Sequence, residues 1–457
     1  MKLHNTYTNT NEEFNPIEGN KVRMYVCGPT VYDYAHLGHA RCYITWDVLY
    51  RYLKFRGYDV TYCRNVTDVD DKILKKAEKE NKTPEEVSQY WYKQFSKSME
   101  ALNTLKPDIE PFATKTLGEM ISMVKDLIAN GYAYEVNGDV YFRVKKFGRY
   151  GSLSGQPIDQ LESGARIEVG EQKEDPLDFA LWKIDEKFGY NSPWGVGRPG
   201  WHIECSAMSR KYLGKTIDIH AGGADLIFPH HENEIAQSEC ANGCKFVNYW
   251  LHNGFVTINK EKMSKSLGNF LTIDDLLKKY DSNTIRFFIL TNHYRMPVEF
   301  SDEALSSAQA GVKRMLNAKR TPVDENFDIT ETEEYKRFTE AMDDDLNTSK
   351  ALAVLFDLTN KANKDEKGAF TILFKLATAL GFTFDKPELS EDDLNNALKH
   401  VSDKLGQEFS SMDELISYRK KAREEKNWAV ADAIRLALDE CNIVLKDSKE
   451  GTSWESK

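Results

Sequence analysis

The chain has no uninterrupted apolar segment long enough to span a membrane. Its first sixteen residues are polar, with Asn and Thr where a secretory signal peptide carries an apolar core. The cysteines are few for 457 residues, odd in number and widely scattered, at positions 27, 42, 63, 205, 240, 244 and 441. Such a distribution favours reduced thiols over a disulfide framework. The sequence therefore predicts a cytoplasmic protein.

Two common nucleotide-binding motifs are also missing. There is no GxxxxGK[ST], which argues against a P-loop enzyme, and no GxGxxG, which argues against a dinucleotide dehydrogenase. There is no internal repeat or low-complexity segment. The length exceeds one ordinary hydrophobic core, so we expect two to four domains.

The net charge of −11 argues against a protein coated in nucleic acid. RNA affinity depends on where cations cluster, however, and not on their sum. One cluster lies near the C-terminus and consists of Arg419, Lys420, Lys421, Arg423 and Lys426. It is either a solvated helix face or an RNA-binding surface.

Alternating residues in 21–28 predict a strand that runs into a loop at Gly28-Pro29. Helical patterning follows from Leu37 to Phe55 and stops at Gly57, and 60–63 reads as the next strand. This βαβ unit implies a parallel sheet with a right-handed crossover. Ligands of such sheets bind at the carboxyl ends of the strands, so we expect Cys27 and the segment 36–39 at the binding edge.

The region 103–197 holds short β-like pieces, 132–134 and 140–142, and is interpreted as an insertion into the sheet. Sheet-like sequence resumes with a strand at 217–220, a helix from Pro229 and the segment 249–258.

The remainder of the chain is predicted to be mostly helical. Helices fill 302–400, and the tail, 403–457, contains helices and a hairpin around 443–454.

His36-Leu37-Gly38-His39 is the first chemical motif. Two imidazoles three residues apart share a helix face. At a helix N-terminus they join backbone N–H groups, an arrangement that suits a phosphate gaining charge. Gly38 lets a flat base or sugar approach the backbone. The alternative is one capping histidine and one solvent-exposed histidine.

The second motif is Lys262-Met263-Ser264-Lys265-Ser266, about 220 residues downstream. Two ammonium groups on a loop can close over a polyphosphate during displacement. Alone, the segment reads as a Lys/Ser surface loop, but the joint occurrence of both motifs predicts nucleotide activation.

Together the two motifs resemble the paired ATP signatures of class I aminoacyl-tRNA synthetases. The residues between them narrow the resemblance to the cysteinyl-tRNA synthetase family, over about residues 20 to 454. The resemblance implies an α/β fold: a Rossmann-like parallel-sheet catalytic domain with an inserted subdomain, an α-helical bundle and a small C-terminal anticodon-binding domain. The implied boundaries are 1–102 and 198–250 for the halves of the catalytic domain, 103–197 for the insertion, 251–302 for the lysine-loop and stem-contact region, 303–400 for the bundle and 401–457 for the anticodon-binding domain.

The family's zinc ligands correspond to Cys27, Cys205, His230 and Glu234, which implies one Zn²⁺ per chain. Two thiolates, an imidazole and a carboxylate are reasonable zinc ligands, although separations this long reveal no site by themselves. His230 and Glu234 are four residues apart on the predicted helix, so both can face one metal. In the family the zinc binds the substrate thiolate, which separates cysteine from serine as an apolar pocket cannot.

Selectivity of that kind removes the need for an editing domain, for which the insertion is short. Cys240 and Cys244 have a tighter, helical spacing, but they match no ligand position of the family and are interpreted as structural or incidental thiols.

The resemblance assigns the remaining site residues. His36, His39, Lys262 and Lys265 are catalytic, and ATP binding adds Gly38, Met263, Ser264 and Ser266. The cysteine and adenylate pocket is lined by Gly28, Thr30, Thr67, Trp201 and His220, for which loop geometry and core packing are the alternative. The anticodon is read by Arg423, Trp428, Asp432 and Asp447, although Trp428 also fits a core position and Asp432 a surface charge.

The implied reaction is activation of L-cysteine with ATP and Mg²⁺, followed by transfer to the 3′ end of tRNACys. The expected partners are tRNACys, ATP and L-cysteine, with no membrane and a monomeric chain. One alternative is a cysteine:amino-sugar ligase of the mycothiol-pathway type, against which the tail 419–454 argues. The other is an inactive RNA-binding scaffold, against which the complete set of histidines and lysines argues.

Overall fold

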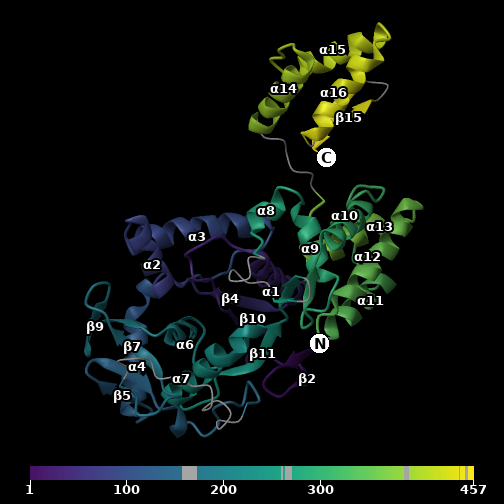
Figure 1. Cartoon of the computed structure of the whole chain (residues 1–457). Coiled ribbons are helices and arrows are strands. Elements are labelled where there is room, and N and C mark those ends of the chain that lie inside the picture. The colour runs from purple at the N-terminus through teal and green to yellow at the C-terminus, as the bar shows by residue number, and fades with distance from the viewer. Residues whose placement is uncertain are drawn as a thin grey trace. The chain divides into compact units, whose positions relative to one another are not determined.

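The structure is a computed structural model that describes residues 1–156, 172–258, 261–262, 270–384, 391–441, 443–447 and 451–456. The chain divides into two compact units, Met1–Phe382 and Thr383–Lys457. Figure 1 shows the chain coloured from purple at the N-terminus to yellow at the C-terminus.

A four-stranded parallel sheet lies at the centre of the first unit, in the order β11-β10-β3-β4. Its strands are β3 (Lys21–Val26), β4 (Asp59–Arg64), β10 (Ile217–Gly223) and β11 (Val247–Asn253). Helix α1 (Leu37–Phe55) connects the neighbouring parallel strands β3 and β4 (Figure 1). The predicted strand–helix–strand unit is therefore present, and the fold class expected from the sequence is confirmed.

The sequence of α1 explains its limits. His36 is the N-cap residue, and the helix ends just before Gly57, whose φ of +85° suits a residue without a side chain. Large side chains such as Trp46 and Tyr52 are fully buried, because α1 packs between the sheet and the helices that follow in the chain. A helix buried on most sides is a rigid base for residues at its N-terminus.

Between β4 and β10 the chain forms helices and a second sheet, and most of that sheet falls in the segment 103–197 that the sequence predicts as an insertion. The helices are α2 (Asp71–Glu80), α3 (Pro84–Ala101) and α4 (Leu117–Ala129), with short turns at Ala113–Lys115 and Val144–Lys146. The sheet is antiparallel, in the order β5-β6-β7-β9-β8, with strands β5 (Ala133–Val136), β6 (Asp139–Phe142), β7 (Phe179–Ile184), β8 (Tyr190–Ser192) and β9 (Gly195–Pro199).

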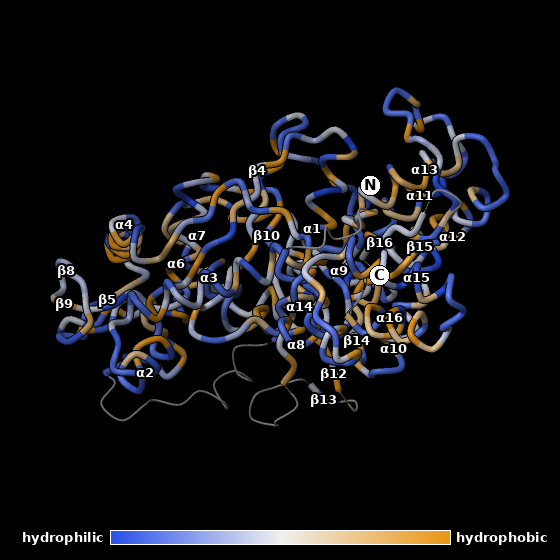
Figure 2. Tube along the Cα trace, turned by 90° about the horizontal axis from the view of Figure 1, so that it is seen from above, coloured by the Kyte–Doolittle hydropathy of each residue, from blue (hydrophilic) through white to orange (hydrophobic). Residues whose placement is uncertain are grey.

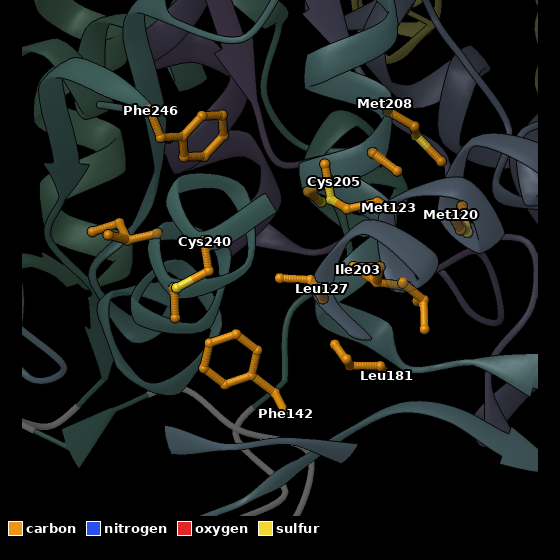
Figure 3. Packing of buried hydrophobic residues seen from close by; sticks show 14 of the residues in the cluster. Met120, Met123, Leu127, Phe142, Leu181, Ile203, Cys205, Met208, Cys240 and Phe246 are labelled. Atoms are coloured by element: carbon orange, nitrogen blue, oxygen red, sulfur yellow. The ribbon is translucent and has the colours of Figure 1, made fainter. Parts of the chain in front are cut away.

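The main hydrophobic core joins this insertion to the central sheet. Helix α6 (Trp201–Tyr212) packs against α4 and α7 (Glu232–Asn242). Figure 3 shows part of this core, with Cys205 and Met208 of α6 near Met123 of α4. Cys205 is therefore held by close packing as well as by its polar partners.

The other elements of the first unit flank the sheet. They are the hairpin β1 (Lys2–Asn5) and β2 (Thr10–Glu13), the small sheet β13-β12-β14 (Glu261–Lys262, Val256–Ile258, Val298–Phe300), and helices α8 (Ile273–Leu277), α9 (Ser282–Leu290), α10 (Asp302–Leu316), α11 (Glu333–Asp343), α12 (Thr348–Asn363) and α13 (Ala369–Ala379).

The second unit has its own hydrophobic core, formed by three helices and a hairpin. These are α14 (Glu391–Leu405), α15 (Met412–Glu424), α16 (Trp428–Glu440), β15 (Ile443–Asp447) and β16 (Thr452–Ser456). The hairpin expected around 443–454 is therefore present.

Polar and hydrophobic residues alternate along most of the chain trace (Figure 2). Within the described ranges, no helix combines the length and the apolar character that crossing a membrane requires.

A buried ion network ties α1 to α9. The Asp47 carboxylate accepts hydrogen bonds from Arg286 at 2.8 Å, from Arg51 at 2.9 Å and from the Leu105 backbone N–H at 2.8 Å. Both Asp47 and Arg286 are buried. The carboxylate thus offsets two guanidinium groups, one of them fully desolvated.

We expect Asp47→Asn to lower the free energy of unfolding of the first unit by about 3–5 kcal/mol, because it leaves a buried guanidinium without its counter-charge. Urea unfolding followed by tryptophan fluorescence measures the change. Asp59→Asn, an exposed carboxylate at the start of β4, is the matched control. Equal midpoints for the two variants would contradict this account.

Candidate active site and metal centre

A hollow of about 340 Å³ opens beyond the carboxyl ends of β3 and β10. Seven residues predicted from the sequence line it: Cys27, Gly28, Thr30, His36, Gly38, His39 and Trp201. Of the other predicted pocket residues, Thr67 and His220 are buried. The structure thus brings most of the predicted pocket to the expected edge of the sheet.

The two histidines of the first motif cap α1 with their own side chains. The Gly38 backbone N–H donates to His36 Nδ1, and the His36 backbone N–H donates to His39 Nδ1, both at 3.1 Å. Since each Nδ1 accepts, the proton of each neutral ring resides on Nε2. The caps therefore fix the tautomer in which both imidazoles are Nε2–H donors.

The chain that follows the second motif pairs with the first. The Leu37 backbone N–H donates to Leu271 O at 3.0 Å, and the Ile273 N–H donates to Ala35 O at 2.9 Å. The Phe270 ring lies 5.0 Å from the His36 ring. Residues 263–269, and with them Met263, Ser264, Lys265 and Ser266, lie outside the described residues, as does the Lys262 side chain. Phe270, the first described residue after the second motif, nevertheless contacts His36.

Four donor groups, Cys27 among them, meet here from three segments of the chain. The Sγ atoms of Cys27 and Cys205 are 3.9 Å apart, and Cys27 Sγ lies 3.6 Å from Glu234 Oε1. His230 Nε2 is 3.1 Å from the same Glu234 oxygen. One ligand atom of each of the four lies within 4.8 Å of the others, and all four residues are buried. Two thiols, an imidazole and a carboxylate at these separations fit a zinc ion.

The helix that holds Glu234 begins at Pro229, as the sequence suggested. The helical segment Ile227–His231 runs directly into α7, and within that segment Phe228 alone has non-helical backbone angles. Phe228 has an extended backbone, as a residue before proline favours. His230 and Glu234 still face each other across the junction.

Hydrogen bonds and charges override burial at several of these donors. Burial alone would raise the pKa of Cys205, but hydrogen bonds with Cys27 and His230 lower it to about 6. Burial, together with Cys205, raises the pKa of Cys27 well above its usual value. Burial would likewise lower the pKa of His230, yet Cys205 and Glu234 raise it to about 10. Glu234, held by His220 and His230 against the effect of burial, has its pKa lowered to about 2. The cluster therefore concentrates negative charge on Cys205 and Glu234, the form in which they bind metal.

A second, overlapping set shares Cys27 and Glu234 and adds His220 and His231. His231 Nε2 lies 3.2 Å from Cys27 Sγ, and its Nδ1 lies 2.8 Å from His252 Nε2. His220 Nε2 lies 2.9 Å from the second Glu234 oxygen. The first set has two thiols and the second has one, so the first is the better match for a thiophilic ion.

Two loops at the strand ends are closely tied beside Cys27. The Gly28 N–H donates to Asn65 Oδ1 at 2.7 Å, and Thr67 Oγ1 donates to buried Glu204 at 2.7 Å. A Cβ on Gly28 would lie 1.6 Å from the Asn65 carbonyl oxygen. Only glycine therefore fits at position 28, and the hydrogen bond to Glu204 holds the Thr67 side chain in place.

We expect Gly28→Ala to separate these loops and to raise the KM for L-cysteine, the substrate that the family resemblance implies, by roughly tenfold or more, since an overlap with backbone forces a shift. Substrate-dependent exchange of pyrophosphate into ATP measures it. Gly118→Ala is the control, because an added Cβ at Gly118 meets no other atom and the backbone there is ordinary. Gly214→Ala would not serve, since Gly214 has a φ of +105°. An unchanged KM in Gly28→Ala, matching that of Gly118→Ala, would show that the loops do not shape the site.

Trp201 lies at the mouth of the hollow. It is 41% exposed, and its ring stacks on His230 at 4.2 Å between centroids. Trp201 therefore lies between the donor cluster, through His230, and the open pocket.

Several lining residues were not predicted from the sequence, among them Tyr32, Asp225 and Asn253. Asp225 and Asn253 lie at or just after the carboxyl ends of β10 and β11. The rule that ligands bind at the carboxyl ends of parallel strands would have pointed to Asp225 and Asn253. Tyr32 has no comparable signal in the sequence.

The predicted RNA-binding residues all belong to the second unit. Trp428 is 57% exposed and is not a core residue, and Asp432, one turn along α16, is also exposed. Asp447 forms ion pairs with Arg423 and with buried Arg419.

Cys240 and Cys244 belong to no cluster of three or more metal-binding groups in the described part of the chain. Burial raises the pKa of Cys240 to about 12. The interpretation of Cys240 as a structural thiol is consistent with both observations.

Comparison with known proteins agrees with this geometry. Residues 13–310 match the family described as "tRNA synthetases class I (C) catalytic domain", and residues 337–406 match the "DALR domain". The cysteine--tRNA ligase of Shouchella clausii is 48% identical, with 100% of this chain and 99% of the relative covered. Those of Francisella philomiragia and Clostridioides difficile are each 47% identical, with complete coverage of both chains.

The chain belongs to the cysteine–tRNA ligase family.

Solved structures of other class I synthetases share the fold of this cysteine–tRNA ligase family member. Methionyl-tRNA synthetase of Mycobacterium tuberculosis, in complex with methionyl-adenylate, superposes with a TM-score of 0.56 at 15% identity, covering 79% of this chain and 89% of that one. A putative arginyl-tRNA synthetase of Campylobacter jejuni gives a TM-score of 0.51 at 13% identity, covering 80% and 91%. At these identities the likeness concerns the fold alone.

Proposed function

We propose that this enzyme activates L-cysteine with ATP, in the presence of Mg²⁺, and transfers the cysteinyl group to the 3′ end of tRNACys. The observation that carries the proposal is the convergence of Cys27, Cys205, His230 and Glu234 behind a hollow whose rim holds His36 and His39. Substrate thiol and nucleotide phosphates are thereby given separate, adjacent sites.

Cys27, Cys205, His230 and Glu234 are the proposed ligands of one Zn²⁺ per chain. When bound there, zinc supplies a soft Lewis acid that prefers a thiolate to the neutral hydroxyl of serine. His220 holds the second oxygen of Glu234, and the protein thus fixes the carboxylate on both sides. Gly28, Thr30, Thr67, Trp201 and His220 are the proposed surroundings of cysteine and its adenylate.

Histidines and lysines of the chain are proposed to stabilise the activation step. The carboxylate of cysteine attacks the α-phosphate of ATP, pyrophosphate leaves, and cysteinyl-adenylate forms. His36 and His39 donate Nε2–H groups toward the phosphates, and Gly38 leaves room for the nucleotide. Lys262 and Lys265, with Met263, Ser264 and Ser266, are proposed to close over the phosphates, and Phe270 anchors the end of that loop against His36.

Transfer requires the tRNA to be held and its 3′ end to reach the adenylate. We propose that residues 401–457 bind the anticodon through Arg423, Trp428, Asp432 and Asp447, since splayed bases are read by stacking and edge hydrogen bonds. The boundaries 1–102, 103–197, 198–250, 251–302 and 303–400 are proposed for the remaining domains. A monomeric enzyme acting in the cytoplasm completes the proposal.

The deciding experiment is attachment of labelled cysteine to total tRNA with ATP and Mg²⁺, scored as alkali-labile label. Charging that excess serine does not compete away is the expected result. Cysteine-dependent pyrophosphate exchange without charging would overturn the tRNA acceptor in favour of another, such as an amino-sugar. Absence of both activities would overturn the enzymatic proposal.

A further inference from the structure

The carboxylate of Asp447 is already engaged from several sides within the second unit. Arg419 of α15 donates from both terminal nitrogens, to Oδ1 at 2.9 Å and to Oδ2 at 3.1 Å. Arg423 forms an ion pair with Oδ2 at 2.9 Å, and Thr452 of β16 donates to Oδ1 at 2.6 Å. Both oxygens of the carboxylate therefore have cationic partners from α15 within this unit.

The two arginines have very different surroundings. Arg419 is 5% exposed and belongs to the face of α15 that covers the core of the unit. The Arg423 side chain, one helical turn further, is 41% exposed. Arg419 is therefore out of reach of RNA, whereas Arg423 is partly in solvent.

Arginines four residues apart share a helix face and repel each other. Asp447 lies against both guanidinium groups and offsets that repulsion, so the head group of Arg423 is drawn toward the carboxylate. A guanidinium held in one orientation loses less conformational entropy when it binds a ligand. The network thus prepares Arg423 in advance of binding.

We infer that Arg419 is a positioning residue for tRNA recognition: it fixes Asp447 and, through it, orients Arg423, without itself contacting RNA. Asp432, by contrast, has no hydrogen-bond or ion-pair partner among the residues that the structure describes. The Asp432 carboxylate is exposed and available to a base edge. This inference rests on the proposed anticodon-binding role of residues 401–457.

The test uses two variants. Arg419→Met keeps the aliphatic part of the side chain and removes the guanidinium group. Arg419→Lys keeps the charge but cannot donate to both oxygens of Asp447 as the guanidinium does. Lys399→Ala, an exposed cation on α14, is the control for loss of one positive charge. Each full-length variant is assayed for cysteine-dependent pyrophosphate exchange and for charging of a tRNACys transcript and of a transcript with an altered anticodon. Charging is measured at several salt concentrations, below the melting temperature of every variant.

We expect both Arg419 variants to lower kcat/KM for the tRNACys transcript by roughly ten- to hundredfold, mainly through KM, because charged hydrogen bonds of this type are lost. Discrimination against the altered anticodon falls with it, and pyrophosphate exchange is unchanged. The salt dependence keeps its slope, since no phosphate contact is removed. Arg419→Met added to Asp447→Asn has little further effect, because the two residues act as one unit.

Different outcomes separate the possible failures. Losses that multiply in the double variant, or a shallower salt slope, would overturn the positioning role in favour of direct contact. Lower melting temperature with unaltered anticodon discrimination would reduce Arg419 to a structural role. If the unmodified enzyme charges the transcript and the Arg419 variants match it, the inference is wrong while the proposed function stands. No charging by the unmodified enzyme is the result that removes the proposed function itself.

Discussion

Cys205→Ser is expected to abolish the metal content of the purified enzyme and to raise the KM for cysteine by at least about 100-fold, the upper range for damage to the surroundings of a metal site. The substitution removes one of two thiols from the donor cluster, and a hydroxyl is a poor ligand for a soft ion. Metal released on denaturation, measured by mass spectrometry, and pyrophosphate exchange at varied cysteine concentration give the two readouts.

Cys240→Ser is the matched control, because Cys240 is buried in the same hydrophobic core but lies outside the donor cluster. A full complement of metal in Cys205→Ser would show that this ligand assignment is wrong. Loss of metal in His231→Gln together with retention in Cys205→Ser would transfer the site to the overlapping set Cys27, His220, His231 and Glu234.

His39→Asn is expected to lower the rate of cysteinyl-adenylate formation by roughly 10²–10³-fold, as for loss of one donor to a developing charge. The asparagine side-chain oxygen takes the place of His39 Nδ1 and accepts the hydrogen bond from the His36 N–H, so the cap is kept. The reach of Nε2–H toward the phosphates is lost. Single-turnover formation of the adenylate from saturating ATP and cysteine is the measurement.

His39→Gln reverses the comparison, since its longer side chain extends toward the position of Nε2 and leaves the cap unmade. We expect it to retain more activity than His39→Asn. Its free energy of unfolding should fall by about 1 kcal/mol, because the cap is lost. A faster enzyme in the asparagine variant than in the glutamine variant would mean that the cap, and not the Nε2–H donor, is what activation requires.

The first strand–helix–strand unit could be predicted from the sequence because its signals are local. Alternation in 21–26, the stop at Gly57 and the next short strand all lie within one segment, and the strands pair as neighbours. The hairpin of the second unit is equally local. The start of the helix that holds Glu234 is local as well, because the extended Phe228 lies just before Pro229 and separates the helix from the preceding turn.

The donor cluster could not be predicted from physical chemistry alone. Cys27 and Cys205 are 178 residues apart and come from different elements, so no spacing rule connects them. Only likeness to a family pointed to them. Nor does the sequence distinguish His230 from His231, which both reach the cluster. The pairing of Arg419 with Asp447 is of the same kind, because it depends on how β15 folds back against α15.

The strand order β11-β10-β3-β4 has a consequence for biosynthesis. Strand β3 pairs with β10 on one side, but β10 is synthesised only after all the residues between β4 and β10. Domains begin to fold while the chain is still emerging from the ribosome. Until Ile217–Gly223 has been made, one edge of β3 has no neighbouring strand in the central sheet, and such edges invite pairing with other chains. Glu234 appears later still. A nascent chain thus carries Cys27 without the full set of donor groups until about half of its residues have been made, and the proposed metal site closes only after Glu234 has been added.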